Sequence, residues 1–260
     1  MNIPFFKYQG TGNDFVIIDQ FNTQYLSLSD TDKIRHLCDR KFGIGADGLM
    51  LLERSDIAKF KMVYFNADGQ LGSLCGNGSR CAVACMHRLG RYEKEGTFDA
   101  SDGIHEAIVQ APNWIDLRMK DLDSIEEGRG FYLLDTGSPH YVTFVEDLSD
   151  LDIVQSGRVI RYSNRFREEG VNVNFVEERD SGIEVNTYER GVENETLSCG
   201  TGVTASALAH ALKHQISQGP TPIKTKGGAL SVRFKRQQSH FTEIWLCGPA
   251  DFVFRGEINL

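Results

Sequence analysis

An internal repeat constrains the fold of this chain more than any other feature of its sequence. A Cys-Gly-Asn-Gly segment at residues 75–78 runs into a helix-prone stretch, and a Cys-Gly-Thr-Gly segment at residues 199–202 does the same 124 positions later. A tyrosine that opens a polar segment stands eleven residues before each first cysteine. This repeat is too long for a solenoid unit, so the sequence predicts two related halves, each a small domain with one such cysteine.

A cysteine at the start of a helix lies beside backbone N–H groups and the positive end of the helix dipole. Both favour the thiolate over the thiol. Two such thiols allow a switchable disulfide, a covalent nucleophile with a separate base, or a two-base proton exchange. In the exchange, one sulfur removes a proton from one face of a carbon and the other delivers a proton to the opposite face. Only the exchange explains why the cysteine and its helix are duplicated.

Polar residues next to the repeats suit a substrate with amino-acid ends. Arg190 can hold a carboxylate through two parallel hydrogen bonds, and Glu189 can accept from an ammonium group. The first N–H groups of each helix can bind an α-carboxylate and the charge that develops when the α-proton leaves. We expect further contacts from asparagine side chains at strand ends and from these N–H groups: Asn13, Asn66, Asn77 and Asn172, with Gly76, Asn77, Gly200 and Thr201.

Composition excludes several other classes of protein. A net charge of −8 over 260 residues argues against nucleic acid or an anionic membrane as the main partner. No segment approaches the roughly 20 apolar residues of a membrane span, and the N-terminal residues lack a charged leader, so we expect a cytoplasmic enzyme. The six cysteines lack the spacing of a secreted disulfide framework.

The sequence also predicts that no cofactor and no metal take part, because it shows neither a Schiff-base lysine context nor a metal-ligand pattern. Cys81 and Cys85 stand four apart near His87, but zinc ligands are normally spaced more tightly, so we interpret them as core residues. His210 and His214, also four apart, are interpreted as side chains that interact with the dipole at an exposed helix end.

Hydrophobic patterns predict strands and helices in the same order in both halves. A charged, non-periodic segment at residues 121–130 is expected to cross between the halves. In the first half we expect strands at 5–8, 15–18, 49–52, 60–65, 97–100, 108–109 and 115–119, with helices at 33–38 and from 76 to about 89. In the second half we expect strands at 131–134, 141–144, 171–176, 183–188, 230–234 and 241–246, with a helix from 200 to about 214.

Six ordered motifs resemble those of the diaminopimelate epimerases, and the resemblance extends from residue 5 to the end of the chain. The motifs lie at residues 12–15, 43–47, 65–69, 75–81, 188–191 and 199–202. The resemblance implies cofactor-independent interconversion of LL- and meso-diaminopimelate in the bacterial route to lysine and peptidoglycan.

The same resemblance implies an α/β fold of two pseudo-symmetric domains, each a mixed β-sheet or barrel wrapped round a central α-helix, with the active site in the interdomain cleft. The C-terminal strand returns to the first domain. We therefore expect one domain at residues 1–120 plus 249–260 and the other at residues 121–248, with a homodimer as a possible assembly.

The resemblance also assigns roles to single residues. Cys75 and Cys199 would be the catalytic pair, and His140 and Glu189 would tune the pKa values of the thiols. Two positions depart from the pattern of many members: Gly48, where glutamine is often found, and Ser138, where asparagine is usual. Both departures bear on the substrate end remote from the reacting carbon. The residues that would contact substrate are Asn13, Asn66, Gly76, Asn77, Asn172, Glu189, Arg190, Gly200 and Thr201.

Three alternatives share some of these features. A proline or hydroxyproline racemase would use the same thiols on a cyclic substrate with one carboxylate, which needs fewer polar contacts than this chain offers. Phenazine-pathway isomerases are related but lack the cysteine pair. A redox sensor could join Cys75 and Cys199 in a disulfide without catalysis. Deuterium incorporation at the α-carbon of candidate amino acids distinguishes the enzymes from the sensor.

Overall fold

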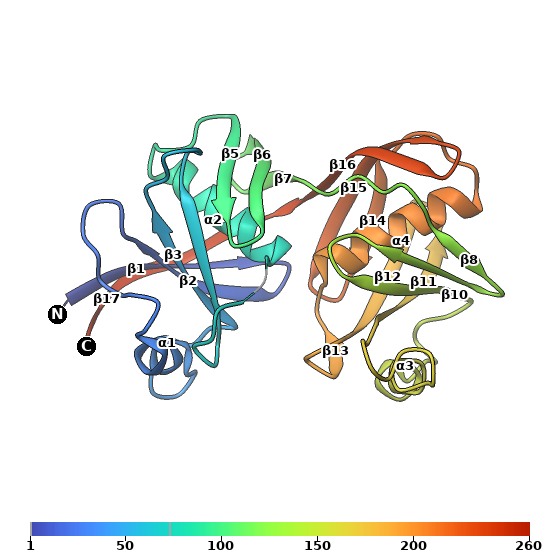
Figure 1. Cartoon of the computed structure of the whole chain (residues 1–260), viewed down its shortest axis with the longest axis horizontal. Helices are drawn as coiled ribbons and strands as arrows, with labels where there is room; N and C mark the ends of the chain where they lie inside the picture. The colour runs from blue at the N-terminus through green and yellow to red at the C-terminus, as the bar shows by residue number, and fades with distance from the viewer. Residues whose placement is uncertain (1, 73) are drawn as a thin grey trace. The chain divides into compact units, whose positions relative to one another are not determined.

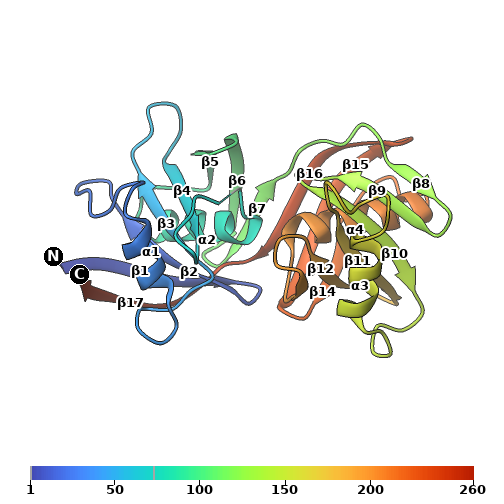
Figure 2. The ribbon, with the colours of Figure 1, turned by 60° about the horizontal axis from the view of Figure 1, so that its bottom comes forward.

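The chain folds into two compact units in the computed structural model, which describes residues 2–72 and 74–260. One unit comprises the residues up to Leu117 together with Gly248–Leu260, and the other comprises Arg118–Cys247. The boundaries predicted from the sequence follow residues 120 and 248. Each unit is a mixed β-sheet with a buried helix against it, so the predicted α/β class is confirmed (Figures 1 and 2).

The first unit orders its strands as β17-β1-β2-β3-β4-β5-β6-β7. The β2–β3 and β4–β5 pairs are parallel, and the other neighbours are antiparallel. Strand β17 comes from the C-terminal end of the chain and pairs with β1 along its length. The elements are β1 (Asn2–Gly10), β2 (Asn13–Asp19), α1 (Thr31–Cys38), β3 (Gly48–Glu53), β4 (Lys61–Asn66), α2 (Gly76–Arg88), β5 (Glu95–Ala100), β6 (Gly103–Ala111), β7 (Trp114–Arg118) and β17 (Asp251–Asn259).

The second unit repeats this topology in the order β8-β9-β10-β11-β12-β14-β15-β16. Here β10–β11 and β12–β14 are the parallel pairs, at the same places in the series. The internal repeat read from the sequence is therefore confirmed as a repeat of sheet topology. The elements are β8 (Glu126–Gly128), β9 (Phe131–Asp135), β10 (Pro139–Val145), α3 (Ile153–Arg161), β11 (Asn172–Arg179), β12 (Gly182–Glu189), β13 (Asn194–Thr196), α4 (Gly200–Lys213), β14 (Thr221–Thr225), β15 (Gly228–Gln237) and β16 (His240–Pro249).

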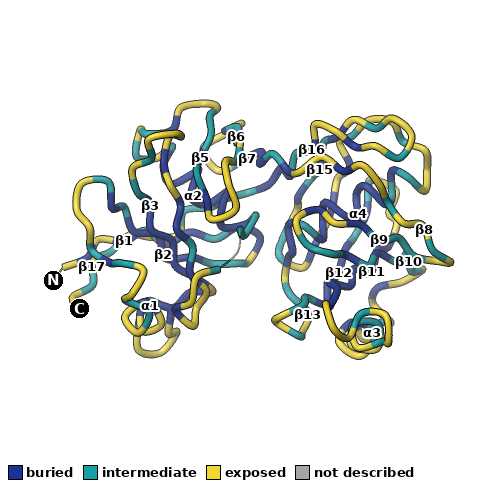
Figure 3. The backbone as a smooth tube through the Cα atoms, in the orientation of Figure 1, coloured by how far each residue is buried: buried dark blue, intermediate teal, exposed yellow. Residues whose placement is uncertain are grey.

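The two helices that follow the cysteine motifs are buried along most of their length, whereas α1 and α3 bury only one side (Figure 3). Small side chains allow this, since α4 runs Ala-Ser-Ala-Leu-Ala through its buried centre. The second glycine of each motif lies close against a side chain of the sheet. A Cβ on Gly78 would lie 2.6 Å from Met50 Cε, and one on Gly202 would lie 2.3 Å from Asn174 Oδ1.

Most predicted elements are confirmed, but four elements and the position of Asn77 differ from the prediction. The segment 121–130 lies within the second unit and contains a short strand, β8, which pairs with β9. Helix α3 and strands β13 and β14 were not predicted. Asn77 lies in helix α2 and not at a strand end, whereas Asn13, Asn66 and Asn172 do lie at ends of strands. Within the described residues, none of the helices is both long and apolar enough to cross a membrane.

Candidate active site

Cys75 and Cys199 occupy the same local position in the two units, the N-cap of a buried helix. Their backbone angles nearly coincide, with φ −108° and ψ 112° at Cys75 and φ −113° and ψ 113° at Cys199. Each carbonyl accepts the first intrahelical hydrogen bond, from Ser79 N and from Val203 N, at 2.8 Å in both cases. The sulfurs therefore lie at the N–H end of a helix dipole, as the sequence predicts.

In the first unit, the side chain of Asn13 lies against the sulfur of Cys75. Its Oδ1 lies 3.5 Å from Cys75 Sγ, and its Nδ2 donates to Asp47 Oδ2 at 2.7 Å. The turn that follows β1 places Asn13 there, with Thr11 and Gly12 at positive φ. Asp47 accepts a second hydrogen bond from Asp14 N, so the amide of Asn13 is held from behind.

A network of charges fixes this loop. Arg40 donates to both oxygens of Asp14, at 3.0 and 2.7 Å, and to Asp47 Oδ1 at 2.7 Å. Lys7 Nζ lies 2.7 Å from Asp14 Oδ2 and also donates to the carbonyl of Gly45. Burial opposes ionisation of Asp14, but the hydrogen bonds from Arg40 and Lys7 outweigh it and hold its pKa well below the usual range.

Replacing Asp14 with asparagine is expected to destabilise the fold by about 1–3 kcal/mol at pH 7, because Lys7 loses its anionic partner in a partly buried site. The native pKa lies below the unfolded value of about 3.9, so this stabilisation is complete above that value and is lost as pH falls. Urea unfolding at pH 7 and pH 3 should show the wild-type advantage narrowing at pH 3. Asp32→Asn, at a carboxylate that is 84% exposed, is the control. An equal difference at both pH values would contradict the linkage.

Asn77 is held by a buried arginine that sequence reasoning does not single out. Arg80 is fully buried, and its guanidinium donates to Asn77 Oδ1 at 2.9 Å and to Pro249 O at 3.3 Å. The last contact ties α2 to the segment that leads into β17. The sequence signal for Arg80 is its place inside the Cys-Gly-Asn-Gly-Ser-Arg motif, within a segment predicted to be a helix. A buried cation needs several hydrogen-bond acceptors, and Asn77 is one of them.

Asn66 and Gly48 lie opposite one another where β4 and β3 pair. Asn66 is exposed, and its backbone closes the turn with Gly69 and Gln70. A Cβ on Gly48 would lie 2.5 Å from the ring of Tyr64 and 2.6 Å from Phe65 O. A larger side chain at position 48 therefore requires Tyr64 and the strand to shift, so the glycine matches this local structure.

In the second unit, a hydroxyl–imidazole cluster lies beside Cys199. Thr201 Oγ1 is 3.4 Å from Cys199 Sγ and 2.9 Å from His140 Nε2, while Ser138 Oγ is 3.0 Å from His140 Nε2 and 3.2 Å from Thr201 Oγ1. Asn172 Nδ2 donates to Ser138 Oγ at 3.1 Å. Parallel pairing of β10 with β11 brings these groups together, with His140 opposite Asn172.

His140 is completely buried and neutral near pH 7. Burial lowers its pKa to about 3, and the positive charge of Arg190 acts in the same direction. Asn174 Nδ2 lies 3.0 Å from His140 Nδ1, and Asn174 Oδ1 accepts from Thr187 at 2.9 Å. The amide nitrogen therefore faces the imidazole, and the single ring proton lies on Nε2.

Glu189 and Arg190 follow one another at the end of β12. Burial raises the pKa of Glu189. Arg190 N donates to Asn172 Oδ1 at 2.9 Å, and the guanidinium of Arg190 donates to Glu169 O at 2.8 Å. Gly170, at φ +78°, makes room for this side chain, since a Cβ there would lie 2.5 Å from Arg190 Cδ. Arg190, Asn172 and, through Ser138, Thr201 thus form one group connected by hydrogen bonds.

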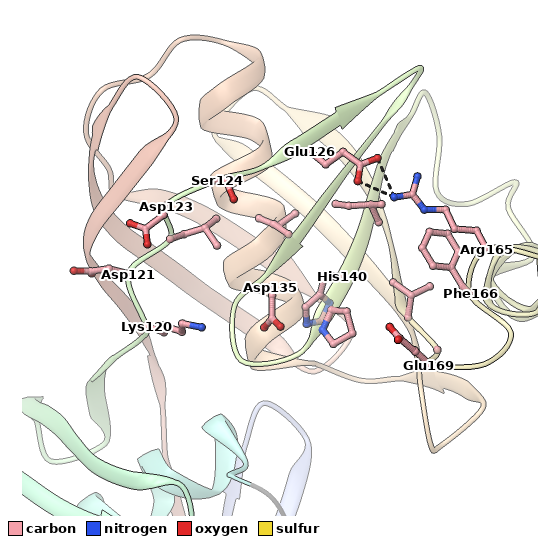
Figure 4. Close-up of a pocket in the computed structure, with 16 residues that line it drawn as sticks. Lys120, Asp121, Asp123, Ser124, Glu126, Asp135, His140, Arg165, Phe166 and Glu169 are labelled. Carbon is pink, nitrogen blue, oxygen red and sulfur yellow. Dashed lines mark hydrogen bonds and ion pairs between the residues drawn. The ribbon is translucent and has the colours of Figure 1, made fainter.

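A pocket of about 550 Å³ in the second unit borders this group (Figure 4). Pro139 and His140 line one side, and Glu169 and Gly170 line another. Figure 4 shows Arg165 joined to Glu126 at a different part of the wall, at 2.7 and 2.9 Å. The residues that line the pocket do not include Cys199 or Thr201, so the pocket adjoins the thiol site without containing it.

Glu178 joins His210 and His214 at the C-terminal end of α4. Their ligand atoms lie within 4.8 Å of one another, the spacing of a candidate metal site within the described residues. Lys213 Nζ already lies 2.9 Å from Glu178 Oε2, and His214 Nε2 lies 2.5 Å from Glu178 Oε1. Because this carboxylate has a cationic partner, we interpret the cluster as an ion-pair link between β11 and α4. His210 is partly buried, so the helix end is less exposed than predicted.

The other cysteines are buried thiols, and the described residues contain no disulfide. Burial raises the pKa of Cys38 and of Cys85 to about 12, and it raises that of Cys81 further. Cys81 and Cys85 do not join His87 in a candidate metal group within the described ranges; the imidazole lies 2.8 Å from Tyr92 O. Their interpretation as core residues is confirmed.

Comparisons with known proteins agree over nearly the whole chain. The family model described as diaminopimelate epimerase matches residues 5–119 and 132–253. The chain is 45% identical to the diaminopimelate epimerase of Flavobacterium psychrophilum, over 97% of this chain and 99% of that protein. It is 40% identical to the diaminopimelate epimerase of Chlorobaculum tepidum, over 96% and 99% of the respective chains.

Solved structures share the fold at low sequence identity. A phenazine biosynthesis protein of the PhzF family from Bacillus anthracis is 13% identical, with a TM-score of 0.73 and complete coverage of both chains. A probable proline racemase from Agrobacterium radiobacter is 14% identical, with a TM-score of 0.67, covering 99% of this chain and 93% of that chain. These two similarities establish the architecture alone.

Proposed function

The chain belongs to the diaminopimelate epimerase family, and on this premise we propose that Cys75 and Cys199 are the acid and the base that invert its substrate's reacting carbon. The reaction is the epimerisation of LL-diaminopimelate to meso-diaminopimelate, an isomerase step of lysine biosynthesis. One observation carries the assignment of the cysteines. Two units with the same sheet topology present a cysteine at the same helix N-cap with nearly the same backbone angles.

The proposed chemistry needs one thiolate and one thiol at a time. The thiolate takes the α-proton and becomes a thiol, while the electron pair of the C–H bond moves onto the carbon and its carboxylate. The opposite thiol then delivers its proton to the other face of the carbon and becomes a thiolate. N–H groups at the starts of α2 and α4 would stabilise the negative charge on the carboxylate, through Gly76, Asn77, Gly200 and Thr201.

The residues around each sulfur have proposed binding roles. Arg190 would pair with a substrate carboxylate, and Glu189 would accept from an ammonium group. Asn13 and Asn172 would add amide contacts, and Asn66 would do so from the exposed end of β4. The connected hydrogen bonds of Asn172, Ser138 and Arg190 support this, because they orient the side chains before substrate binds.

We also propose a cytoplasmic location and a homodimer for this protein. Six thiols without a disulfide in the described residues suit a reducing compartment. Phe42, 77% exposed, and Val253, 51% exposed, are large apolar side chains on the surface of the first unit, available to an interface. Light scattering after size-exclusion chromatography measures the mass of the assembly.

The alternatives fit the findings less well. The proline racemase and the PhzF-type protein share the fold at 14% and 13% identity, whereas the named epimerases reach 45% and 40%. A cyclic substrate with one carboxylate would also leave Glu189 and Arg190 with less to bind. A purely redox role for Cys75 and Cys199 does not explain the polar group around Thr201 and His140.

Incubation in heavy water is expected to place deuterium at the α-carbon of diaminopimelate, because each inversion exchanges the substrate proton for one from a thiol that equilibrates with solvent. Proton NMR should show loss of the α-proton signal of the LL isomer together with appearance of the meso isomer. L-Proline and trans-4-hydroxy-L-proline, incubated in parallel, should keep their α-protons. Exchange into proline but not into diaminopimelate would overturn the proposed function.

A further inference from the structure

The ring of Tyr64 lies between two glycines in the first unit. A Cβ on Gly48 would lie 2.5 Å from Tyr64 Cε2 and 2.9 Å from its hydroxyl oxygen, and a Cβ on Gly72 would lie 2.5 Å from Tyr64 Cδ1 and from Cε1. Neither glycine adopts a left-handed φ, so neither is needed for a special backbone conformation. The two positions instead leave room for the ring.

The strand register places this ring on the face of the sheet that carries the candidate site. Phe15, Gly48 and Asn66 are paired side by side on β2, β3 and β4, so they share one face. Tyr64 stands two residues before Asn66, and Asn13 stands two before Phe15, so both belong to the same face. The rings of Phe15 and Tyr64 meet edge to face with centroids 6.1 Å apart, which agrees with this placement.

The hydroxyl of Tyr64 points to the edge of the sheet at which the site residues lie. Strands β2 and β3 begin at this edge, with Asn13 and Gly48, and β4 ends there, with Asn66. Tyr64 lies two residues further in, opposite Met50. Its hydroxyl nevertheless lies beside the Cβ position of Gly48, so the ring leans along the sheet toward the edge. The hydroxyl thus takes the place that a side chain at position 48 would occupy.

The ring also packs against the segment that leads to the thiol of the first unit. Gly72 N donates to the carbonyl of Tyr64 at 3.0 Å, and Leu71 pairs with Phe65. Gly72 stands three residues before Cys75. A purely structural role in holding this segment needs the ring and not the hydroxyl. Phenylalanine at position 64 therefore distinguishes a structural role from a role in binding.

The place of the hydroxyl suits the end of the substrate that is remote from the reacting carbon. Under the proposed function the reacting carbon lies at Cys75, whose sulfur is 3.5 Å from Asn13 Oδ1 on β2. Neighbouring strands lie about 5 Å apart, so a hydroxyl over β3 is about one strand spacing from β2. A short methylene chain separates the two amino-acid ends of diaminopimelate, so a group at this spacing can reach the remote end. A carboxylate there only accepts hydrogen bonds, and a phenolic O–H that donates to it forms a charge-assisted bond.

We propose that Tyr64 is a further substrate-binding residue, whose hydroxyl donates to the carboxylate at the remote end of diaminopimelate. Gly48 and Gly72 leave the room that this position of the ring requires. The inference rests on the proposed function, because it concerns the remote end of that substrate. The hydroxyl takes no part in proton transfer, so it contributes to substrate binding more than to turnover.

Tyr64→Phe keeps the ring and removes the hydroxyl. The KM for diaminopimelate should rise about tenfold while kcat stays within about twofold, because the lost contact is made equally to substrate and transition state. Tyr25→Phe is the matched control, since that partly buried tyrosine packs against the hydrophobic core of the same unit, and its KM should equal that of the wild type. Circular dichroism checks the fold of both variants. A wild-type KM in folded Tyr64→Phe overturns the proposal.

A second substitution tests the position of the ring. Gly48→Ala places a Cβ where Tyr64 Cε2 and the hydroxyl now lie, so the ring must move and KM should rise. In the double variant with Tyr64→Phe, KM should rise no further than in the more affected single variant, because both changes remove the same contact. Full additivity of the two effects contradicts a shared contact and overturns the proposal.

Two competitive inhibitors identify the group that the hydroxyl contacts. L-2-Aminopimelate keeps the remote carboxylate of diaminopimelate and lacks the remote ammonium, whereas L-lysine keeps the remote ammonium and lacks that carboxylate. The Ki of L-2-aminopimelate should rise about tenfold in Tyr64→Phe, and the Ki of L-lysine should stay at its wild-type value. A rise for L-lysine alone, or for neither inhibitor, overturns the proposal.

The outcomes separate this inference from the proposed function. Deuterium exchange into diaminopimelate by the wild type, together with an unchanged KM in Tyr64→Phe, would retain the function and reject the binding role of Tyr64. Absence of exchange into diaminopimelate by the wild type would reject the function itself, whatever the variants show.

Discussion

Replacing either Cys75 or Cys199 with serine should lower kcat/KM for epimerisation by about 10²–10⁴-fold, the range associated with loss of a general acid or base. A serine hydroxyl is far harder to ionise near neutral pH than a thiol, so one face of the carbon loses its proton carrier. The backbone at each N-cap should accept serine readily, since serine is a preferred residue there. Initial rates from each stereoisomer, measured by a coupled or polarimetric assay, check the loss.

The two-base proposal also predicts how the two serine variants exchange the α-proton with solvent. With one base removed, the remaining sulfur can still take and return a proton on its own face, so exchange without inversion should survive on one stereoisomer and differ between the two variants. Cys85→Ala is the matched control, because that thiol lies in α2, is buried, and has its pKa raised to about 12. Wild-type epimerisation by either serine variant would remove that cysteine from the reaction.

The repeat of the fold could be predicted because short segments of the sequence indicate it in both halves. Glycines after each cysteine, the β-branched strands and the ends of α2 and α4 follow from short-range patterns. Helix α3 does carry such a signal, since Asp152 caps it and its side chain accepts from Gln155 N, but this signal was not used in the prediction. The segment 121–130 is charged and non-periodic, which predicts a linker; its strand β8 has only three residues and pairs with β9 across the turn at Arg129 and Gly130, too short a run to show an alternating pattern.

The candidate site could be predicted as a set of residues but not as a network. The positions of Cys199, His140 and Asn172 in the motifs are enough to propose them as site residues. The role of Ser138 depends on a hydroxyl that bridges His140 and Thr201, and the role of Arg80 depends on a carbonyl 169 positions away at Pro249. Which way an amide points, as at Asn13, follows only from partners that the fold brings together.

The contacts of Arg190 indicate that its side chain can be replaced while the fold stays intact. One N–H of its guanidinium donates to Glu169 O at 2.8 Å, and its backbone N–H donates to Asn172 Oδ1 at 2.9 Å. The backbone contact survives any substitution that is not proline, so Asn172 stays oriented. The repeat gives Asn66 as the corresponding position in the first half, exposed and uncharged. Because only one of the two halves has a charge at this position, the pair suits a substrate whose two ends are bound differently.

Arg190→Ala is therefore expected to lower kcat/KM for diaminopimelate by about 10- to 100-fold, the loss of a charge-assisted carboxylate contact of about 1.5–3 kcal/mol. Arg190→Lys should fall between this variant and the wild type, since lysine keeps the charge and loses the planar pair of donors. Circular dichroism should show both variants folded, because the side chain is only partly buried.

A control arginine separates this role from a general effect of surface charge. Arg179, on the neighbouring β11, pairs with Glu177 and Glu184 and is 49% exposed, so Arg179→Ala removes the same charge away from the thiol site. Its kcat/KM should stay within about twofold of the wild type, because Arg179 lies at the opposite end of β11 from Asn172. If Arg190→Ala behaves like Arg179→Ala in steady-state kinetics, the guanidinium of Arg190 does not bind the substrate, and the carboxylate must be held by the helix N–H groups alone.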